Sequence, residues 1–353
     1  MPAEKGVTLC DCERCWEGYT LLQSRFEQAA RLIDLDGNEV HRWEHDLQHE
    51  DLEDAFWTGW HYAEMMPDGN LVAIIKEVED GFPGVILELD WNGNPVWRAD
   101  VAAHHDFERL ENGNTLVVCR EYVENPLIRS GRIKSDSILE VSPDGNVVWE
   151  WHVDRHAEEI AALVDVEFPR EEYDWAHTNT VESLPPNAAA EEDGRFRPGN
   201  VLFSSRNIDT VGIIDRESGE VVWAWGPGVL EKQHMPTMLE NGHLLIFDNG
   251  CYRESSAVVE MDPLTGEVVW EYEGSPPESF YTVTRGANQR LPNGNTLITE
   301  SDREGHVFEV TPEKKIVWDY WNTDLTGDGD GQPIYRAMRY GMELVDRLRE
   351  EES

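Results

Sequence analysis

Histidines recur at equivalent places of a repeated sequence pattern, and they are the residues of this chain best suited to chemistry. Each copy contains a Leu or Met ahead of a Gly turn, and counting back five from it gives one column: His61, His105, Asn179, His234 and Gly286. His177 and Thr284 precede two of these positions by two residues, on the same face of a strand. Three of the chain's 12 histidines in a column of five exceed what chance would place there.

Two explanations fit this column. A histidine inherited by duplication would persist whether or not it is used. Against this, the column varies among His, Asn and Gly, whereas the repeated Trp and turn Gly stay fixed. We therefore expect specialised positions that converge on one polar funnel, formed by His105, His177, Asn179, His234 and Thr284.

Arg206 is the cation that stands out near this group. It lies in Leu202-Phe-Ser-Ser-Arg-Asn207, and we expect it inside an apolar strand that follows the strand of His177 and Asn179. An ion pair with a carboxylate would explain it; the alternative is an anion pocket in which Arg206, the imidazoles, Asn179 and Thr284 donate hydrogen bonds. The column contains no carboxylate, so we expect a carboxylate-poor site for a tetrahedral oxyanion rather than a hydrolytic acid pair or a hard cation.

Two alternating cassettes must position these residues. One is an apolar strand, a Gly turn and a second strand with Trp, and the other is a hairpin with an Asn-Gly or Asp-Gly turn. Together they give four short strands per unit of about 45 to 50 residues, the size of a propeller blade. Six Trp cassettes predict an all-β, six-bladed β-propeller with a short C-terminal helix. The cassettes end at Trp43, Trp97, Trp149, Trp223, Trp270 and Trp318, and the hairpins cover residues 65–73, 109–117, 238–246 and 290–298.

The chain divides by pattern into three parts. We expect an N-terminal extension over residues 1–17, the propeller over 18–321, and an acidic turn with an amphipathic helix over 322–353. The strand that begins at Gly18 is expected to complete the sixth blade, and residues 333–351 are expected to be helical. Two inserts stretch the third copy, a helix-like segment over 155–166 and a loop over 186–199.

The charge of the chain excludes several partners. It carries 71 Asp and Glu against 29 Lys and Arg, a net charge of −42, with 40% hydrophobic residues. Such a surface repels nucleic acids and anionic membranes. Because only six of the cations are Lys, we expect a halophile with a salt-rich cytosol, where this charge is screened. No 18-residue apolar stretch and no signal-peptide pattern is found, so we expect a soluble cytoplasmic protein.

The five cysteines raise the question of a metal. Cys10, Cys12 and Cys15 have ligand-like spacing, but no second cysteine pair follows them. We therefore expect reduced thiols there, ordinary buried strand residues at Cys119 and Cys251, and neither metal nor cofactor in the protein.

The ordered set of motifs resembles the arylsulfate sulfotransferase (arylsulfotransferase) family, in an acidic, haloarchaeal type. The resemblance implies a six-bladed propeller that moves a sulfuryl group between phenols without the nucleotide donor PAPS. Its partners would be an aryl sulfate donor and a phenol acceptor. The motifs run from Gly18-Tyr-Thr-Leu-Leu through His104-His105-Asp106, Asp174-Trp-Ala-His-Thr-Asn179, Ser204-Ser-Arg206 and Gln233-His234 to Tyr335-Arg-Ala-Met-Arg-Tyr340.

The resemblance also implies roles for individual residues. His234 matches the histidine that becomes covalently sulfated, which gives ping-pong kinetics through a sulfohistidine. The residues that match the holders of the sulfuryl oxygens are His105, His177, Asn179, Arg206 and Thr284, and we expect His177 and Arg206 to carry the positive charge. Phe280 and Tyr281 are expected to shape a slot for the aromatic acceptor.

Two rival readings remain open. A propeller of this kind can be a non-enzymatic binding or scaffold protein, although a scaffold needs no group of imidazoles and an Arg facing one point. The segment Asp262-Pro-Leu-Thr-Gly-Glu-Val-Val-Trp270 resembles the Trp docking repeat of quinone-dependent dehydrogenases. Those enzymes need eight blades and a Ca²⁺ site, for which this chain is too short.

Overall fold

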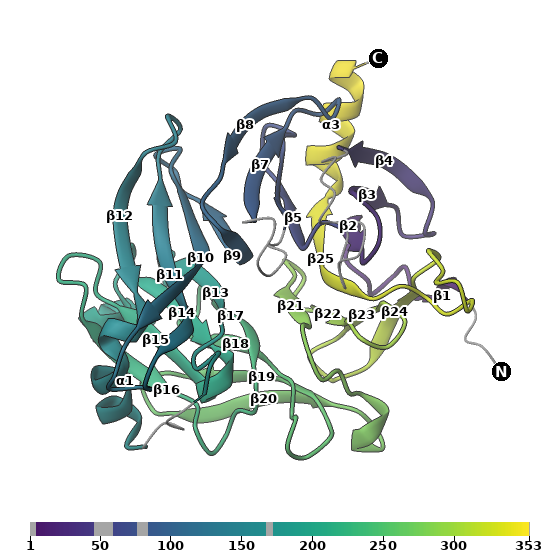
Figure 1. The fold of residues 1–353 in the computed structure, drawn as a ribbon. Coiled ribbons are helices and arrows are strands. Elements are labelled where there is room, and N and C mark those ends of the chain that lie inside the picture. Colours follow the sequence, from purple (N-terminus) through teal and green to yellow (C-terminus); the bar gives the residue numbers. More distant parts are fainter. Residues whose placement is uncertain (1–4, 46–58, 76–83, 167–171, 353) are drawn as a thin grey trace. The chain divides into compact units, whose positions relative to one another are not determined.

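The computed structural model describes residues 5–45, 59–75, 84–166 and 172–352. Six antiparallel sheets, five of four strands and one of five, form a six-bladed β-propeller with a short C-terminal helix, α3 (Met342–Glu352), as predicted (Figure 1). The chain divides into two compact units, residues 102–283 and residues 1–101 with 284–353. Each unit holds three sheets and is described by itself below.

In the unit of residues 102–283, the sheets follow one another along the chain, and the first strand of each carries part of the histidine column. The expected inserts contain helices α1 (Ala157–Val164) and α2 (Ala189–Glu192). The first sheet comprises β9 (Ala103–Arg109), β10 (Thr115–Glu124), β11 (Arg132–Val141) and β12 (Val147–His152); the second β13 (Thr178–Ser183), β14 (Val201–Ser205), β15 (Thr210–Ile214) and β16 (Val221–Trp225); the third β17 (His234–Met238), β18 (Leu244–Asp248), β19 (Ala257–Asp262) and β20 (Glu267–Glu273).

The other unit combines both ends of the chain. One sheet comprises β5 (Tyr62–Met65), β6 (Leu71–Ile75), β7 (Val85–Leu89) and β8 (Pro95–Ala99). A second comprises β21 (Ala287–Arg290), β22 (Thr296–Glu300), β23 (His306–Val310) and β24 (Ile316–Trp321), with β1 (Gly6–Cys10) added at the edge. The third joins β25 (Ile334–Gly341) to β2 (Gly18–Ser24), β3 (Ala29–Ile33) and β4 (Glu39–Glu44).

Two expectations about the chain ends are wrong. Residues 334–341 form strand β25 rather than a helix, and β25 pairs with β2, with Tyr19 opposite Tyr340. The strand from Gly18 therefore belongs to a blade that β25 completes, and not to the sixth Trp cassette. A short apolar run does not distinguish a strand from a helix by its pattern alone, and β25 is buried along most of its length. The domain boundaries at residues 17 and 321 stay a prediction.

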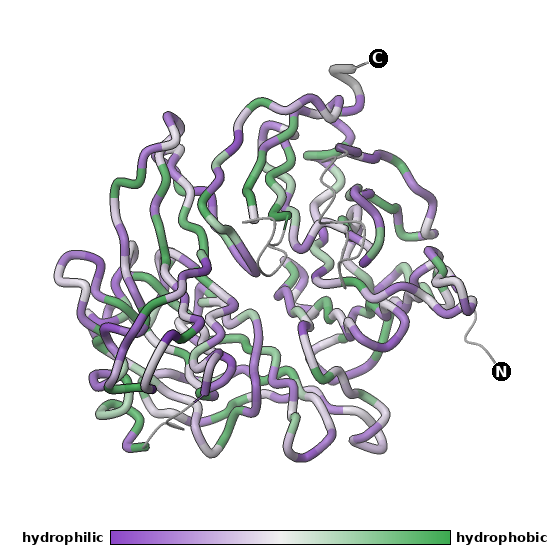
Figure 2. The backbone as a smooth tube through the Cα atoms, viewed as in Figure 1, coloured by the Kyte–Doolittle hydropathy of each residue, from purple (hydrophilic) through white to green (hydrophobic). Residues whose placement is uncertain are grey.

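The repeated cassettes appear as predicted. Each Trp cassette forms the last two strands of a sheet, and the same register shift interrupts that pairing in all six sheets. Each predicted Asn-Gly or Asp-Gly hairpin joins the first two strands. At Gly242, which has φ +85°, a Cβ atom would lie 2.4 Å from the backbone nitrogen of Ala189, so only glycine fits. Figure 2 shows hydrophobic stretches along the strands and hydrophilic turns between them.

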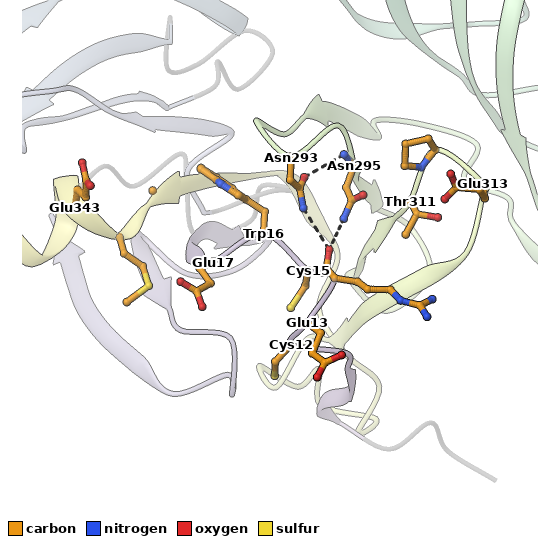
Figure 3. A pocket seen from close by; sticks show the side chains of 14 residues that line it. Cys12, Glu13, Cys15, Trp16, Glu17, Asn293, Asn295, Thr311, Glu313 and Glu343 are labelled. Atoms are coloured by element: carbon orange, nitrogen blue, oxygen red, sulfur yellow. Dashed lines mark hydrogen bonds between the residues drawn. The ribbon is translucent and has the colours of Figure 1, made fainter.

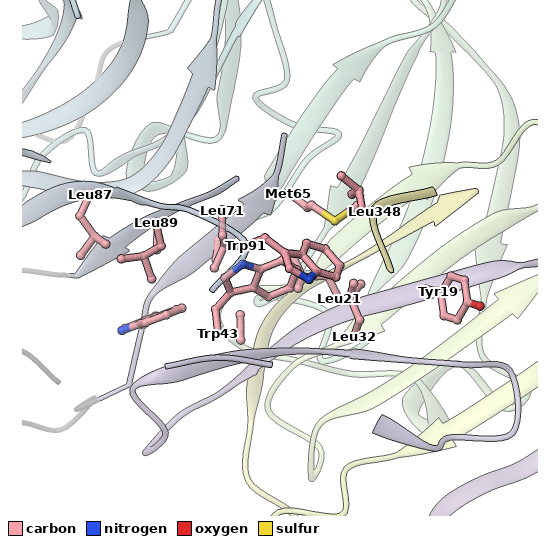
Figure 4. Close-up of a cluster of buried hydrophobic side chains, with 14 of the residues drawn as sticks. Tyr19, Leu21, Leu32, Trp43, Met65, Leu71, Leu87, Leu89, Trp91 and Leu348 are labelled. Atoms are coloured by element: carbon pink, nitrogen blue, oxygen red, sulfur yellow. The ribbon is translucent and has the colours of Figure 1, made fainter. Parts of the chain in front are cut away.

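Helix α3 closes the core of its unit. Leu348 packs in a cluster with Trp43, Trp91 and Leu71, from three different strands or their turns (Figure 4). Burial of such side chains contributes roughly 1.5–3 kcal/mol each, so the helix adds stability to the sheets that it covers. Among the described residues, no helix is long and apolar enough to cross a membrane.

His306 is a buried ionic residue in the same unit. Its imidazole lies 2.8 Å from Glu300 and 2.6 Å from Asp319, and it stacks on Trp321. Burial alone would lower the pKa of His306, but the hydrogen bonds to Asp319 and Glu300 outweigh it and raise the pKa. The charged form of His306 is therefore favoured in the folded protein.

Candidate functional site

Side-chain-to-backbone hydrogen bonds join the first strands of the three sheets in the unit of residues 102–283. Asp106 on β9 accepts a hydrogen bond from the backbone nitrogen of Val181 on β13, at 3.0 Å. Thr180 on β13 accepts one from the nitrogen of Met235 on β17, also at 3.0 Å. These hydrogen bonds hold β9 next to β13 and β13 next to β17, so the candidate site residues on the three strands lie in that order.

The backbone is irregular where the site residues lie. His105, His177 and Met235 have positive φ values of 62°, 54° and 45°. The pairing of β9 and of β17 with the next strand shifts register across His105 and Met235, and the pairing of β13 shifts register just after His177. Such conformations cost about 1–3 kcal/mol each for residues other than glycine, and bulges next to functional sites redirect side chains. The irregular backbone therefore turns these side chains away from the direction that a regular strand would give them.

The His234 imidazole is oriented by Asn249. Its Nδ1 lies 2.7 Å from Oδ1 of Asn249, whose Nδ2 donates to the carbonyl oxygen of Thr282 at 2.9 Å. Because a carbonyl only accepts, the amide nitrogen of Asn249 must face Thr282, and the amide oxygen must face His234. The neutral His234 ring therefore carries its proton on Nδ1 and its lone pair on Nε2. His234 is 2% exposed and Asn249 is fully buried.

His105 and His177 form a second pair. Their Nε2 atoms are 3.2 Å apart, and Nδ1 of His177 lies 2.8 Å from Oδ2 of Asp174. Burial would raise the pKa of Asp174, but His177 and the charges of Arg120 and Lys134 hold it below its usual range. Asp174 is thus a carboxylate that accepts a hydrogen bond from Nδ1–H of His177, which leaves Nε2 of His177 to accept a hydrogen bond from Nε2–H of His105.

Burial lowers the pKa of His177, and its hydrogen bond to Asp174 offsets this only in part. The neutral form of His177 is therefore favoured in the fold, which argues against the expectation that it carries positive charge. A neutral imidazole with its lone pair on Nε2 is a base and a hydrogen-bond acceptor.

A buried carboxylate supports this pair from behind. Asp136 on β11 accepts a hydrogen bond from Arg120 at 2.6 Å and another from the backbone nitrogen of Thr178 at 2.6 Å. Its Oδ1 also lies 3.1 Å from Nε2 of His104, whose Nδ1 contacts Nδ1 of His105. Burial raises the pKa of Asp136, and the charge of Arg120 opposes this. Asp136 thus connects β9, β10 and β13.

Arg206 makes no ion pair with a carboxylate among the residues that the structure describes. Its guanidinium donates to the side-chain oxygen of Asn207 at 3.0 Å and to the carbonyl of Val283 at 3.3 Å. Lys232 lies close to Arg206. Burial lowers the pKa of Lys232, the charge of Asp209 opposes this, and the positive charge of Arg206 lowers the pKa further. Two cations therefore share this region, which is the arrangement expected of an anion site.

The remaining predicted residues have different surroundings. Asn179 is fully buried, and its Nδ2 donates to the backbone carbonyl of Gln233 at 2.8 Å, which ties it to the strand of His234. Phe280 is 3% exposed and packs edge-on against Phe247 and Tyr272, whereas Tyr281 is half-buried.

Thr284 and the column residue His61 belong to the other unit. The hydroxyl of Thr284 donates to Asp302 at 2.9 Å and accepts from Arg285 at 2.8 Å. His61 is buried beside Tyr335. Neither is placed with respect to the histidines of residues 102–283. Within that unit, hydrogen bonds of side chains and adjoining backbone connect the site residues His105, His177, Asn179, Arg206 and His234.

Three details differ from the sequence expectations. The surroundings of His105 and His177 are not carboxylate-poor, because Asp136 and Asp174 lie there and are balanced by Arg120 and Lys134. Arg206 follows β14 in a 3₁₀ turn, η4 (Arg206–Ile208), because the strand ends at Ser205. Cys251 is half-buried in a turn, whereas Cys119 is buried on β10 as expected.

Sequence reasoning missed the supporting residues. Asp174 and His104 stood inside motifs that were recognised, but their roles were not. Arg120, Asp136 and Asn249 gave no signal, because they come from second or third strands, which the column comparison does not include.

Residues 62–323 match the sequence profile of the arylsulfotransferase (ASST) family. The chain belongs to the arylsulfotransferase family. The match covers most of the chain and all five site residues within the unit of residues 102–283. A comparison with curated proteins finds no match.

Comparisons with solved structures agree with the fold of this arylsulfotransferase family member. A protein of unknown function from Bacteroides caccae has 15% sequence identity and a TM-score of 0.58, covering 92% of this chain and 98% of its own. Apo AztD from Citrobacter koseri has 11% identity and a TM-score of 0.47, with coverage of 92% and 98%. At 15% identity, the likeness to the Bacteroides caccae protein shows the fold alone.

Proposed function

We propose that the protein is a PAPS-independent aryl sulfotransferase that moves a sulfuryl group from a phenolic sulfate ester to a phenol through a sulfohistidine on His234. Membership of the arylsulfotransferase family supports the substrate class. The observation that carries the proposal is the oriented His234 ring, whose Nδ1 donates to Asn249 and whose lone pair lies on Nε2.

In the first half-reaction, Nε2 of His234 attacks the sulfur atom as the sulfur–oxygen bond to the aryl group breaks. The bonding electrons leave with the phenolate, and the sulfated ring becomes cationic. The hydrogen bond from Nδ1 to Asn249 then becomes charge-assisted and stronger. Arg206 and Lys232 offer positive charge to the sulfuryl oxygens, on which charge is spread in a loose transition state.

In the second half-reaction, the oxygen of the acceptor phenol attacks the sulfur atom and the bond to Nε2 breaks. The phenol must lose a proton. Neutral His177, held by Asp174, is the base that we assign to this step; its Nε2 releases the hydrogen bond from His105 and takes the phenol proton. Tyr281 is our candidate for the wall of the acceptor slot, while the burial of Phe280 favours a packing role. Asn179 and Thr284 remain proposed contacts of the sulfuryl group.

The test is a chromogenic aryl sulfate in molar KCl, with and without a phenol acceptor. We expect acceptor-dependent phenolate release and a sulfo adduct on the His234 peptide by mass spectrometry. His234→Ala should abolish both. His243→Ala is the matched control, because His243 lies in the turn of the same blade and pairs with Glu260. Turnover by His234→Ala at the wild-type rate would refute the enzyme assignment, and binding of aryl sulfate without turnover would support the alternative of a non-enzymatic binding propeller.

We further propose that the protein works in the high-salt cytosol of a halophile and is of the haloarchaeal type. The net charge of −42 with only six Lys supports this habitat. Five free cysteines agree with a reducing compartment. Stability and activity measured between about 0.2 and 3 M KCl test it, since a screened acidic surface requires salt; a flat salt profile would contradict it.

A further inference from the structure

Three cysteine sulfurs gather at one point of the unit that holds both chain ends. The Sγ atom of Cys10 lies 2.7 Å from that of Cys12 and 3.8 Å from that of Cys15, and all three lie within 4.8 Å of one another. All are free thiols. The sequence alone suggested ordinary reduced cysteines, but the fold gives them the arrangement of a ligand set.

The loop that carries these sulfurs is held from both sides. Cys10 ends strand β1, opposite Trp318 on β24. The backbone nitrogen of Asp11 donates to Val317 at 2.7 Å, and that of Cys15 donates back to Asp11 at 3.0 Å, which closes a tight turn. A ligand set on such a fixed turn needs little reorganisation to bind an ion.

The far end of the turn is fixed by an Asn-Gly hairpin. Side-chain amides of Asn293 and Asn295 donate to the carbonyl of Arg14 at 3.3 and 2.8 Å (Figure 3). Two residues further along the chain, the backbone nitrogen of Trp16 donates to Glu309 at 2.8 Å. The hairpin therefore positions the cysteine turn in addition to joining its own strands.

We propose that Cys10, Cys12 and Cys15 bind one thiophilic metal ion, Zn²⁺ or Cu⁺, through three thiolates. The separation of Cys10 and Cys15, 3.8 Å, is that of two sulfurs on a tetrahedral ion with bonds of about 2.3 Å. Cys12 must move outward by about 1 Å to reach the same spacing, and it is exposed and able to do so. Soft thiolates select these ions over Mg²⁺ and Ca²⁺.

The surroundings leave room for a further ligand. Cys12 and Cys15 line a cavity of about 810 Å³ (Figure 3), whose wall also includes Glu17, Glu313 and Glu343. Cys15 is 7% exposed and belongs to the hydrophobic cluster around Trp318, while Cys12 faces solvent. The ion would enter from the cavity, complete its coordination with water or a carboxylate, and tie the N-terminal strand to its blade.

The experiment uses the full chain, reduced and stripped of metal under anaerobic conditions. Zn²⁺, Co²⁺ as its spectroscopic substitute, and Cu⁺ are titrated separately in molar KCl. We expect one equivalent of Zn²⁺ or Cu⁺ per chain. With Co²⁺ we expect thiolate-to-metal charge-transfer absorption together with the visible bands of a tetrahedral ion. The metal-bound chain should also melt at a higher temperature than the stripped chain.

The variants decide whether these cysteines are the ligands. Cys12→Ser is the principal test, because an exposed residue can be replaced without disturbing the core, and it should lose stoichiometric binding and the absorption band. Cys251→Ser, another partly accessible free cysteine, is the matched control and should keep both. The proposal is overturned if neither ion binds, if Cys12→Ser binds as the wild type does, or if the reduced and stripped chain reoxidises to a disulfide that metal does not prevent. None of these results depends on sulfotransferase activity.

Discussion

Asn249 offers a sharper test of the nucleophile than replacement of His234, because it contacts the ring nitrogen that does not attack. We predict that Asn249→Ala lowers kcat for aryl sulfate by about 10- to 150-fold while the chain stays folded. Alanine removes the acceptor of the Nδ1 proton, so both neutral tautomers of His234 become accessible, and in one of them Nε2 has no lone pair.

The magnitude follows from the hydrogen bond itself. A hydrogen bond to a neutral ring contributes about 1 kcal/mol, and one to a charged ring about 1.5–3 kcal/mol. The ring gains charge as it is sulfated, so the variant loses about 0.5–2 kcal/mol more in the transition state than in the ground state. Losing the tautomer preference adds about 1 kcal/mol. A total of about 1.5–3 kcal/mol, at 1.36 kcal/mol for each factor of ten, gives the stated range.

The assay separates orientation from stability. Phenolate release is measured in stopped flow without acceptor, so that the sulfation of His234 is observed alone. Ser256→Ala is the matched control, because Ser256 is also buried and its hydroxyl donates to the carbonyl of Asn249 and accepts from the nitrogen of Thr282, whereas the ring of His234 is hydrogen-bonded to Asn249. We expect Ser256→Ala to lower the denaturation midpoint while the sulfation rate stays within about threefold of wild type.

Two results would refute this reasoning. One is a sulfation rate for Asn249→Ala that stays within threefold of wild type; the other is an equal loss in Ser256→Ala, which would assign the effect to the loop. Asn249→Asp adds an independent signature. Its carboxylate favours the charged ring and should move the acid limb of kcat/KM to higher pH, which a structural role would not do.

The remaining predictions concern other parts of the structure. Arg206→Ala should cost about 10²–10³-fold in kcat, with partial recovery in Arg206→Lys, and a loss below tenfold would exclude Arg206 from the transition state. Asp174→Asn should lower the pKa of His177 further and shift the acid limb of acceptor-dependent turnover to lower pH, leaving the burst without acceptor intact; an unchanged limb would contradict the assigned base. Because the pKa of His306 is raised in the fold, its contribution to stability is present below about pH 6.5 and is lost as pH rises through the folded value. Denaturation midpoints of wild type should therefore fall more than those of His306→Gln between pH 6 and pH 9, and parallel curves would remove His306 as the cause.

The fold was predictable where its rules are local. A turn glycine with flanking strands specifies a hairpin within ten residues, so six Trp cassettes were enough to count six blades. The chain ends were not predictable in the same way. Which strand completes which blade is decided by pairing over more than 300 residues, as between Tyr19 and Tyr340, and neither segment contains the repeated cassette. The local sequence pattern predicts that β25 is apolar, but it does not indicate which strand β25 pairs with.

The site residues also differ in whether local sequence patterns could reveal them. The column found His105, Asn179 and His234, because equivalent positions of duplicated strands can be compared within one chain. Asn249 is not in a column: it follows β18 and reaches His234 only because β17 and β18 are paired, with His234 opposite Phe247. Sequence comparison therefore missed Asn249, which orients the ring, although it found the residues that we propose for the chemistry.

The net charge of −42 is compatible with an anion site because the balance of charge is local. Around His105 and His177, the carboxylates of Asp136 and Asp174 are matched by Arg120 and Lys134, so this region adds little net negative charge. Arg206 makes hydrogen bonds only to neutral oxygens among the described residues. In molar salt the Debye length is about 3 Å, so the electrostatic potential of the acidic surface decays before it reaches Arg206. The sulfuryl group would thus respond to the few charges that it touches, which is why single substitutions at Arg206 and Asp174 are expected to have large effects in a protein with 71 acidic residues.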